Sequence, residues 1–375
     1  MTGNFSSDTI SFGNINIIKP VNTGTDVFVA KYDSSGTAVW ANRLGGSSSD
    51  FGNSITVDAG QNVYVTGNYY STFITFGAST LTNAGGGNDD FFIAKFDSVG
   101  NPAWAKGSSG STASDGGSAV ATDLFGSVYA TGHFSGITIS FGSASITTAG
   151  GFFLVKYNSA GTVQWARNPS MGAGEGRAIA TDELGAIYVT GDYFPTITFG
   201  STTLANTGGT NLFAVKYNSS GTAQWAKSAT ATVSAIIPGS IALDTNNTIY
   251  IAGSFFSSTA QFSTIGLVNS GTVGDIFVAR LGFPNVDVNN IEKNENAFSV
   301  YPNPSDGLIR IDFQKESSEA RLSVINILGE TVFTKNLSGR DRNYSGIINL
   351  NLQAGIYFIS IVDGVNKYVR KLVVE

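Results

Sequence analysis

A block of about sixty residues recurs along the first three quarters of this chain. One half of the block, DVFVAKYDSSGTAVWA at 26–41, returns at 90–105, 151–166 and 211–226, with a truncated copy at 275–282. The other half, SITVDAGQNVYVTGNY at 54–69, returns at 119–134, 178–193 and 240–255. All four tryptophans stand at one repeat position: Trp40, Trp104, Trp165 and Trp225. Two motifs that recur together identify a repeat protein.

Each repeat predicts four short β-strands and no helix. Runs such as SITVD, VYVTGNY, FFIAKFD and AVWA are rich in β-branched and aromatic residues, and glycine-containing turns separate them. Four-stranded antiparallel units without helices favour an all-β β-propeller. A β-solenoid is the structural alternative, although its rungs lack paired tight hairpins.

The repeats predict about five visible blades within residues 1–282. The expected units lie near residues 1–42, 46–107, 108–168, 169–229 and 230–282. Residues 1–5 align with 65–69, so the first unit lacks its first strand, and the last unit lacks its fourth. We therefore expect an N-terminal truncation that removed a signal peptide, the closing strand and one or two blades.

Composition excludes several kinds of chemistry. The chain has no cysteine and one histidine, His133, which excludes disulfides, thiolate nucleophiles, cysteine-based zinc sites and most Ser-His-Asp or multi-histidine centres. A net charge of −6 makes nucleic acid an unsuitable partner. No apolar run approaches the roughly 18 residues of a bilayer span, so we expect no transmembrane segment. The N-terminus as written has no signal peptide.

The last part of the chain differs from the repeats. Residues 283–297 are polar and rich in asparagine, which predicts a linker. Residues 298–375 contain short alternating runs separated by turn residues, which predicts a small antiparallel β-sandwich.

Both regions resemble known families. The hairpin VYVTGNY and the run FFIAKFD with its following tryptophan resemble the SBBP-type bacterial β-propeller repeat. The tail is similar to the type A C-terminal sorting domain of the type IX secretion system, found in Bacteroidota. The residues that carry this second resemblance are Tyr301, Pro302, Asn303, Pro304, Gly307, Gly329, Gly355, Tyr357 and Lys371.

The tail resemblance implies export. It makes the type IX secretion machinery a partner and places the mature protein outside the cell or on its outer surface. In the family the tail is usually removed on arrival, and the cargo is released or fixed to the surface.

Three acids are candidate ligand-binding residues. Asp50, Asp115 and Glu175 lie seven or eight residues before the aspartate that ends each first strand. They could bind a hard cation such as Ca²⁺, or two of them could form the acid and base of a glycosidase. They could equally be ordinary loop acids, and we expect no other cofactor or metal.

Aromatic residues that end the second strands are further candidates, chiefly Tyr69 and Tyr193. Their rings could stack on sugars. They could instead be covered by the insertions that follow, where pairs such as Ile74 and Phe76 look like packing partners.

Two recurring charged positions predict structural roles. Asp58, Asp123, Asp182 and Asp244 are expected to cap backbone amides in their turns. Lys31, Lys95, Lys156, Lys216 and Arg280 are expected to make a repeated contact within each blade. His133 stands where other copies carry Asn4, Asn68, Asp192 and Ser254, so this position simply accepts polar residues.

These observations favour an exported, non-catalytic binding or adhesion module for glycan or protein. The alternative is a polysaccharide-active enzyme, a glycosidase or lyase, that uses acids on the loop face. A third reading is a structural spacer. Near-identical repeats favour the first, because an active site needs unlike residues in one or two blades.

Overall fold

The structure is a computed structural model of the 375-residue chain. It describes residues 1–20, 24–84, 86–110, 112–206, 208–244, 247–271, 273–281, 298–314, 319–326, 331–338, 343–363 and 366–375. The chain divides into two compact units, Met1–Leu281 and Gly282–Glu375. The predicted linker at 283–297 lies outside the described residues.

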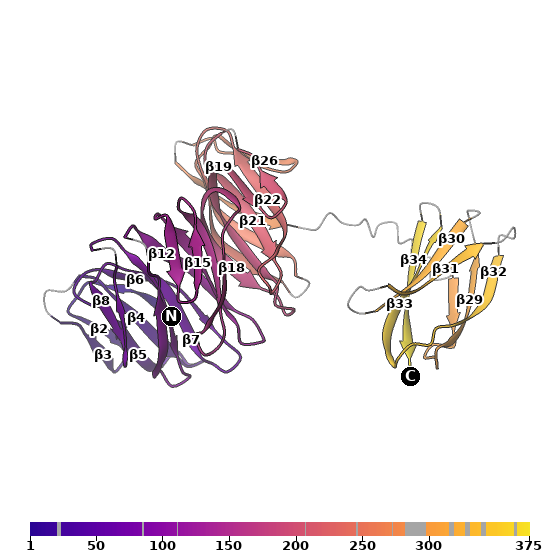
Figure 1. Ribbon diagram of the computed structural model, residues 1–375, viewed down its shortest axis with the longest axis horizontal. Helices are drawn as coiled ribbons and strands as arrows, with labels where there is room; N and C mark the ends of the chain where they lie inside the picture. The colour runs from indigo at the N-terminus through magenta and orange to yellow at the C-terminus, as the bar shows by residue number, and fades with distance from the viewer. Residues whose placement is uncertain are drawn as a thin grey trace. The chain divides into compact units, whose positions relative to one another are not determined.

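Five antiparallel sheets, here called blades 1 to 5, form the unit Met1–Leu281, and their strands are hydrogen-bonded in chain order (Figure 1). The first strands are β6 (Asp50–Val57), β12 (Asp115–Thr122), β18 (Met171–Thr181) and β23 (Ile236–Leu243). The second strands are β1 (Thr2–Phe5), β7 (Val63–Tyr69), β13 (Val128–Phe134), β19 (Ile187–Phe199) and β24 (Ile249–Phe255). The third strands are β4 (Asp26–Tyr32), β10 (Asp90–Phe96), β16 (Gly151–Tyr157), β21 (Asn211–Tyr217) and β27 (Asp275–Leu281). The fourth strands are β5 (Ala38–Leu44), β11 (Pro102–Gly107), β17 (Val163–Arg167) and β22 (Ala223–Ala231).

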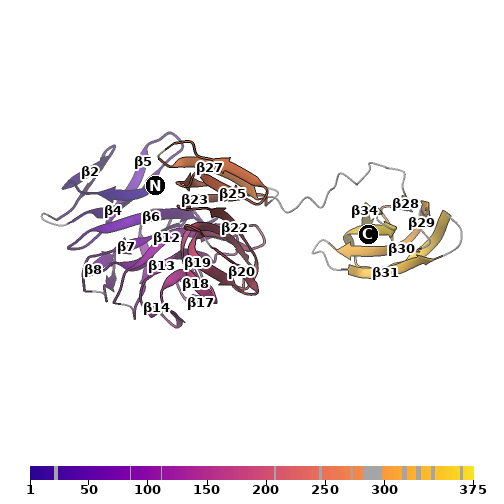
Figure 2. The ribbon, with the colours of Figure 1, turned by 90° about the horizontal axis from the view of Figure 1, so that it is seen from above.

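The blades fan around a centre toward which the first strands face (Figure 2). Within the described residues, blades 2 to 4 carry all four strands, blade 1 consists of β1, β4 and β5, and blade 5 of β23, β24 and β27. The predicted fold class is confirmed: the repeat region is an all-β propeller.

The insertion between the second and third strands of each blade forms a small hairpin. These hairpins are β2 (Thr9–Phe12) with β3 (Ile15–Ile18), β8 (Phe73–Phe76) with β9 (Ser79–Thr82), β14 (Thr138–Phe141) with β15 (Ala144–Thr147), the end of β19 with β20 (Thr202–Leu204), and β25 (Thr259–Phe262) with β26 (Ile265–Val268). In blade 2, Ile74 and Phe76 of the hairpin are 1% and 3% exposed and pack in the same core as Tyr69.

Apolar side chains between consecutive blades form the cores. Between blades 2 and 3, the Phe91 ring lies 5.5 Å from Phe141 and 5.3 Å from Phe153, both in edge geometry. Such edge contacts are a favoured arrangement of aromatic pairs. Strands that are packed on both faces explain why the third strands are nearly continuous apolar runs.

The repeated aspartates organise the turn between the first and second strands. Asp123 Oδ1 accepts hydrogen bonds from the amides of Phe125 and Ser127, and Asp123 Oδ2 accepts from the Tyr129 hydroxyl at 2.8 Å. Asp58, Asp182 and Asp244 make the corresponding bonds in their blades. The predicted capping role is confirmed.

The repeated lysines of blades 1 to 3 join neighbouring blades, whereas the expected ion pair within a blade forms in blade 4, where Lys216 Nζ lies 3.9 Å from Asp182 Oδ2. Lys31, Lys95 and Lys156 donate to the carbonyl oxygens of Ser98, Ser159 and Ser219, each in the next blade. The reason is that these side chains lie on the strand face that packs against the following blade. Trp40, Trp104 and Trp165 donate their indole N–H to the same three carbonyl oxygens.

The second unit is a sandwich of two antiparallel sheets. One sheet contains β28 (Phe298–Tyr301), β29 (Leu308–Gln314) and β32 (Asn343–Asn349). The other contains β31 (Thr331–Ser338), β30 (Glu319–Asn326), β33 (Gly355–Asp363) and β34 (Asn366–Val374). Side chains such as Ile311, Leu322, Ile361 and Leu372 form the core between them. The described part of the chain has no helix long and apolar enough to cross a bilayer.

Candidate functional site at the mouth of the central cavity

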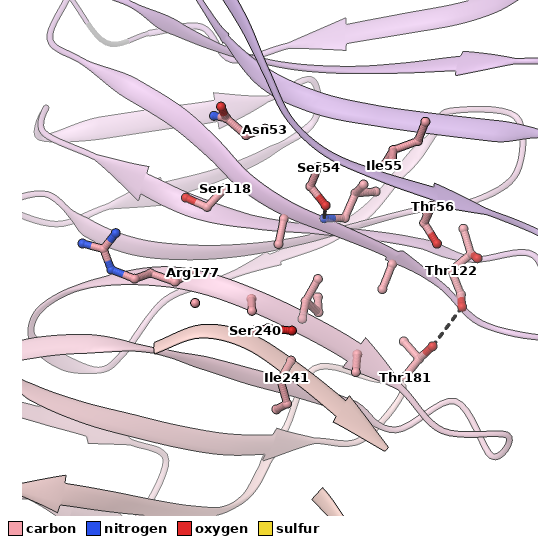
Figure 3. Close-up of a pocket in the computed structure, with 17 residues that line it drawn as sticks. Asn53, Ser54, Ile55, Thr56, Ser118, Thr122, Arg177, Thr181, Ser240 and Ile241 are labelled. Atoms are coloured by element: carbon pink, nitrogen blue, oxygen red, sulfur yellow. Dashed lines mark hydrogen bonds between the residues drawn. The ribbon is translucent and has the colours of Figure 1, made fainter. Parts of the chain in front are cut away.

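The first strands of blades 2 to 5 line an open cavity of about 450 Å³ (Figure 3). Its wall includes the hydroxyl groups of Ser54, Thr56, Thr122, Thr181 and Ser240. Small-molecule sites typically measure about 300–1,000 Å³. The cavity therefore has the size of a ligand site, and its lining is polar.

A β-bulge in each first strand places one extra residue beside this cavity. The pairing of β6 with β7 skips Asn53, and the equivalent strands skip Ser118, Arg177 and Gly239. All four bulge residues line the cavity, and Asn53, Ser118 and Arg177 lie at one end of it (Figure 3). Bulges commonly redirect a side chain beside a functional site. We call this end of the cavity the mouth.

A glycine before the bulge lets blades 2 to 4 approach the preceding blade closely, whereas blade 5 carries Pro238 at this position. A Cβ on Gly117 would lie 2.3 Å from Thr66 Oγ1 in the preceding blade. Blades 2 to 4 therefore need glycine here, and the chain leaves the regular ladder one residue later.

A second set of unlike polar residues lies at the mouth on the second strands. Asn68, His133, Asp192 and Ser254 pair with Phe51, Gly116, Glu175 and Ile237 on the neighbouring first strands. Side chains of directly opposed residues share one face of the sheet. The blades, which are nearly identical elsewhere, thus differ from one another around the mouth.

Blades 3 and 4 contribute a charged network to the mouth. Arg177 Nη2 lies 2.8 Å from Glu175 Oε2, and Arg177 Nε donates to Asp192 Oδ1. His133 Nδ1 lies 3.4 Å from Glu175 Oε1. The guanidinium charge of Arg177 is therefore balanced by two carboxylates.

This network shifts the ionisation of its members in different directions. The Glu175 carboxylate beside His133 raises the pKa of the imidazole, although burial opposes this. Burial would raise the pKa of Glu175, but its contacts with His133 and Arg177 together lower it. Burial raises the pKa of Asp192 in spite of Arg177. Two adjacent carboxyl groups thus titrate apart, with Glu175 the more acidic.

Blade 2 contributes two amides and the carboxylate of Asp89. Asn53 Nδ2 donates to Asn68 Oδ1 at 3.0 Å and to the carbonyl oxygen of Gly117 at 2.9 Å. Asn68 Nδ2 donates to Asp89 Oδ2 at 2.7 Å. These bonds fix the orientation of both amides at the edge of the mouth.

The three predicted ligand acids do not occupy equivalent places. Asp50 and Asp115 begin their strands, pair with Tyr69 and Phe134, and are 1% and 0% exposed. Glu175 pairs with Asp192, one register position further along, and only this acid lies at the mouth. Asp50 accepts bonds from the Gly46 amide and the Ser71 hydroxyl, and burial raises its pKa to about 6. Asp50 therefore shapes its own loop.

No metal-binding group brings the predicted acids together. Across the residues that the structure describes, no three His, Asp or Glu side chains are arranged to hold a metal ion. The predicted aromatic residues Tyr69 and Tyr193 are 0% and 1% exposed and pack in the cores between blades. Neither ring is therefore accessible for stacking on a sugar.

The mouth residues Asn53, Ser118 and Arg177 were not predicted from the sequence. The sequence offers one indication of them: their repeat position varies in charge and size, whereas the residues that follow it are nearly identical from repeat to repeat. A bulge itself depends on cross-strand pairing and leaves no fixed sequence pattern.

The sorting-motif residues of the tail gather around the end of the chain. Asn303 Nδ2 donates to the carbonyl oxygen of Lys371 at 2.8 Å, and the Val373 amide donates to Asn303 Oδ1 at 2.9 Å. Ser305, just after Pro304, exchanges backbone bonds with Val373 and Glu375. The segment Tyr301–Pro304 is thereby tied to β34.

The other motif residues have local roles. The Tyr301 hydroxyl donates to Asp312 Oδ2 at 2.6 Å, and the Tyr357 hydroxyl donates to the carbonyl oxygen of Gln353 at 3.0 Å. Gly307 has φ +96°, a left-handed conformation that favours glycine. Gly355 begins β33. Gly329 lies outside the described residues.

Comparisons with known proteins agree with both regions. Residues 299–375 match the family described as a secretion system C-terminal sorting domain, and residues 39–68 match a β-propeller repeat family. An uncharacterized WD repeat-containing protein of Acanthamoeba polyphaga mimivirus is 26% identical over 207 residues, which cover 46% of this chain and 15% of that protein.

Among solved structures, a similar chain is PorZ, an essential bacterial surface component of the type-IX secretion system of Porphyromonas gingivalis. It shares 13% identity at a TM-score of 0.28, over 100% of this chain and 51% of PorZ. The chain thus spans about half the length of PorZ and a smaller part of the viral protein. By its matched segments, the protein carries an SBBP-type β-propeller repeat and a type IX C-terminal sorting domain.

Proposed function

We propose that this protein is an exported β-propeller that binds a glycan or protein ligand at the mouth of its cavity without transforming it. The type IX sorting domain implies the secretion machinery as a partner and supports a location outside the cell. Release from the surface or retention on it is part of the same proposal.

One observation carries the binding role: the repeats differ from each other where they surround the mouth. The turn aspartates of blades 2 to 5, and the lysines and tryptophans that join blades 1 to 3 to the next blade, are the same from blade to blade and hold the fold together. The bulge position instead carries Asn53, Ser118, Arg177 and Gly239 in turn. The bulge residue stands outside the strand ladder, so it is where the blades can carry different ligand contacts without a change of fold.

A catalytic role is a second candidate, favoured by one specific contact. Glu175 and Asp192 are opposed on neighbouring strands, share Arg177 and have pKa shifts in opposite directions. Two carboxyl groups held apart in ionisation are what a glycosidase acid and base require. Asp50 and Asp115 are too deeply buried to serve this purpose.

The test measures binding of the full chain to glycan and peptide arrays, together with hydrolysis of the same polysaccharides. Replacing Ser118 by Trp should block the mouth and abolish binding. Replacing the exposed Val99 by Trp, in a turn between the third and fourth strands, is the matched control and should leave binding intact. Binding that Ser118→Trp does not affect would exclude the mouth. Turnover that Glu175→Gln abolishes would establish the enzyme instead.

A further inference from the structure

Among the first strands that the structure describes, that of blade 2 carries an aromatic ring two residues before its bulge, next to the mouth. Phe51 pairs with Asn68, whereas the same register position holds Gly116, Glu175 and Ile237 in the following blades. The Phe51 ring is partly exposed and meets Tyr70 edge-on, with ring centroids 6.2 Å apart. Tyr70 itself is 38% exposed. An accessible aromatic face therefore stands at the edge of blade 2.

Planar amides lie directly beside this ring. Phe51 precedes Asn53 by two residues on β6, and its register partner Asn68 shares its face of the sheet. The Asn53 amide uses its Nδ2 for Asn68 and Gly117, which leaves Oδ1 as an acceptor on an exposed side chain. The two amides are held in place before any ligand arrives, which lowers the ordering cost of binding.

The charges at the mouth decide which ligands are admitted. Asp89 beside Asn68, with Glu175 and Asp192, supplies three carboxyl groups. The guanidinium of Arg177 is already bonded to two of them. An anionic ligand would meet this excess of negative charge, because the cationic groups described at the mouth, Arg177 and the protonated His133, already lie against Glu175. A neutral polyol can donate hydroxyl protons to carboxylates and accept from donors such as Ser118.

We infer that the ligand of the mouth is an uncharged carbohydrate, with a sugar ring against Phe51 and its hydroxyl groups bonded to Asn53 and neighbouring polar groups. This inference rests on the proposed function and narrows it to one chemical class. A flat apolar sugar face covers the aromatic ring, and the amides set the orientation of the hydroxyls. The carboxylates discriminate against uronic acids and sulfated sugars.

The experiment titrates the full chain with cellohexaose, mannohexaose, xylohexaose and chitohexaose, and with oligogalacturonate and oligolysine as charged probes. We expect at least one neutral hexaose to bind, with an affinity that changes little between about 50 and 500 mM NaCl. Phe51→Ala should weaken it by about tenfold or more. Phe125→Ala, which removes an exposed ring from the turn between the first and second strands of blade 3, is the control and should have no effect.

The unfolding temperature of each variant separates loss of binding from loss of fold. Phe51→Trp keeps an aromatic face and should retain binding. The inference is overturned if no neutral hexaose binds, if only a charged probe binds, or if Phe51→Ala leaves hexaose binding unchanged. If a charged probe or a peptide binds instead and Ser118→Trp abolishes that binding, the sugar assignment is overturned and the proposed binding role stands. If no tested ligand shows binding that Ser118→Trp abolishes, both the sugar assignment and the proposed binding role are overturned.

Discussion

Lys95 and Trp104 donate hydrogen bonds to one acceptor, the carbonyl oxygen of Ser159, at 3.1 Å each. The same Lys95 ammonium group lies 5.2 Å from the centre of the Tyr64 ring, a cation–π distance. The acceptor belongs to the following blade. Blades 1 to 3 are each clamped to the next blade in this way, by a lysine of the third strand and a tryptophan of the fourth.

The clamp predicts unequal effects of the same substitution in different blades. Trp225 Nε1 is buried and has no hydrogen-bond acceptor among the described residues. Trp104→Phe should therefore lower the free energy of unfolding by about 1 kcal/mol more than Trp225→Phe, because only the former loses a hydrogen bond. Chemical denaturation of the two variants measures this difference. Equal losses would contradict the clamp.

Asp90 should make the propeller less stable as the pH rises from about 4 to 6. Burial raises the pKa of Asp90 to about 6, so in this window the carboxyl ionises in the unfolded chain before it does so in the folded chain. Asp90→Asn should therefore stabilise the protein by about 1 kcal/mol at pH 7 and by less at pH 4. Asn211 already occupies the equivalent position in blade 4.

The control for this prediction has the opposite sign. Hydrogen bonds from Asn101 lower the pKa of Asp97, so its contribution to stability is present at neutral pH and is lost as the pH falls. Asp97→Asn should therefore be destabilising at pH 7 and have a smaller effect at low pH. Thermal unfolding at both pH values tests the pair. An Asp90→Asn effect that is the same at pH 4 and pH 7 would show that its ionisation is not involved.

His133 should give the propeller a pH dependence near neutrality. Its raised pKa means that the protonated imidazole stabilises the fold below about pH 6.5, and that this contribution is lost as the pH rises through the folded pKa. His133→Asn, which copies Asn68 of blade 2, should remove this slope. Unfolding curves between about pH 6 and 8 report it. If the stability of the wild type and that of His133→Asn depend on pH in the same way, the His133–Glu175 contact is excluded.

Asn303 should hold the last strand of the tail in place. Asn303→Ala removes both hydrogen bonds to the backbone of β34, so amide hydrogen exchange there should accelerate by about tenfold. Asn336→Ala, at an exposed position of β31, is the matched control. Unchanged exchange at Val373 would show that the segment Tyr301–Pro304 acts in another way. Measured on cells, the same variant should also reduce the exported fraction if this docking is what the secretion machinery reads.

The sequence predicts the propeller well because each strand carries its own evidence. Runs such as VYVTGNY have the composition of strands, and glycine-containing turns separate them. Their recurrence along the chain then separates one blade from the next. The lysine contacts between blades could not be predicted because a strand pattern does not say which face meets the next blade, whereas the Lys216–Asp182 ion pair lies within blade 4 as expected. Glu175 was grouped with Asp50 and Asp115 because spacing along the chain hides a shift of one register position. The mouth as a whole was out of reach, since Asn53, Ser118 and Arg177 come together only through four bulges and the closure of neighbouring sheets.

Substitutions at the bulges and substitutions at the residues that hold the blades together have different consequences for the fold. Clamp and turn residues act between or within particular blades, and a change there affects the whole array. A bulge residue stands outside the strand ladder, so its identity can change while the ladder around it persists. A propeller built this way can acquire a new specificity by duplicating a blade and altering one residue in the copy. Its binding specificity can then evolve by single substitutions at the bulge position, without a new binding surface.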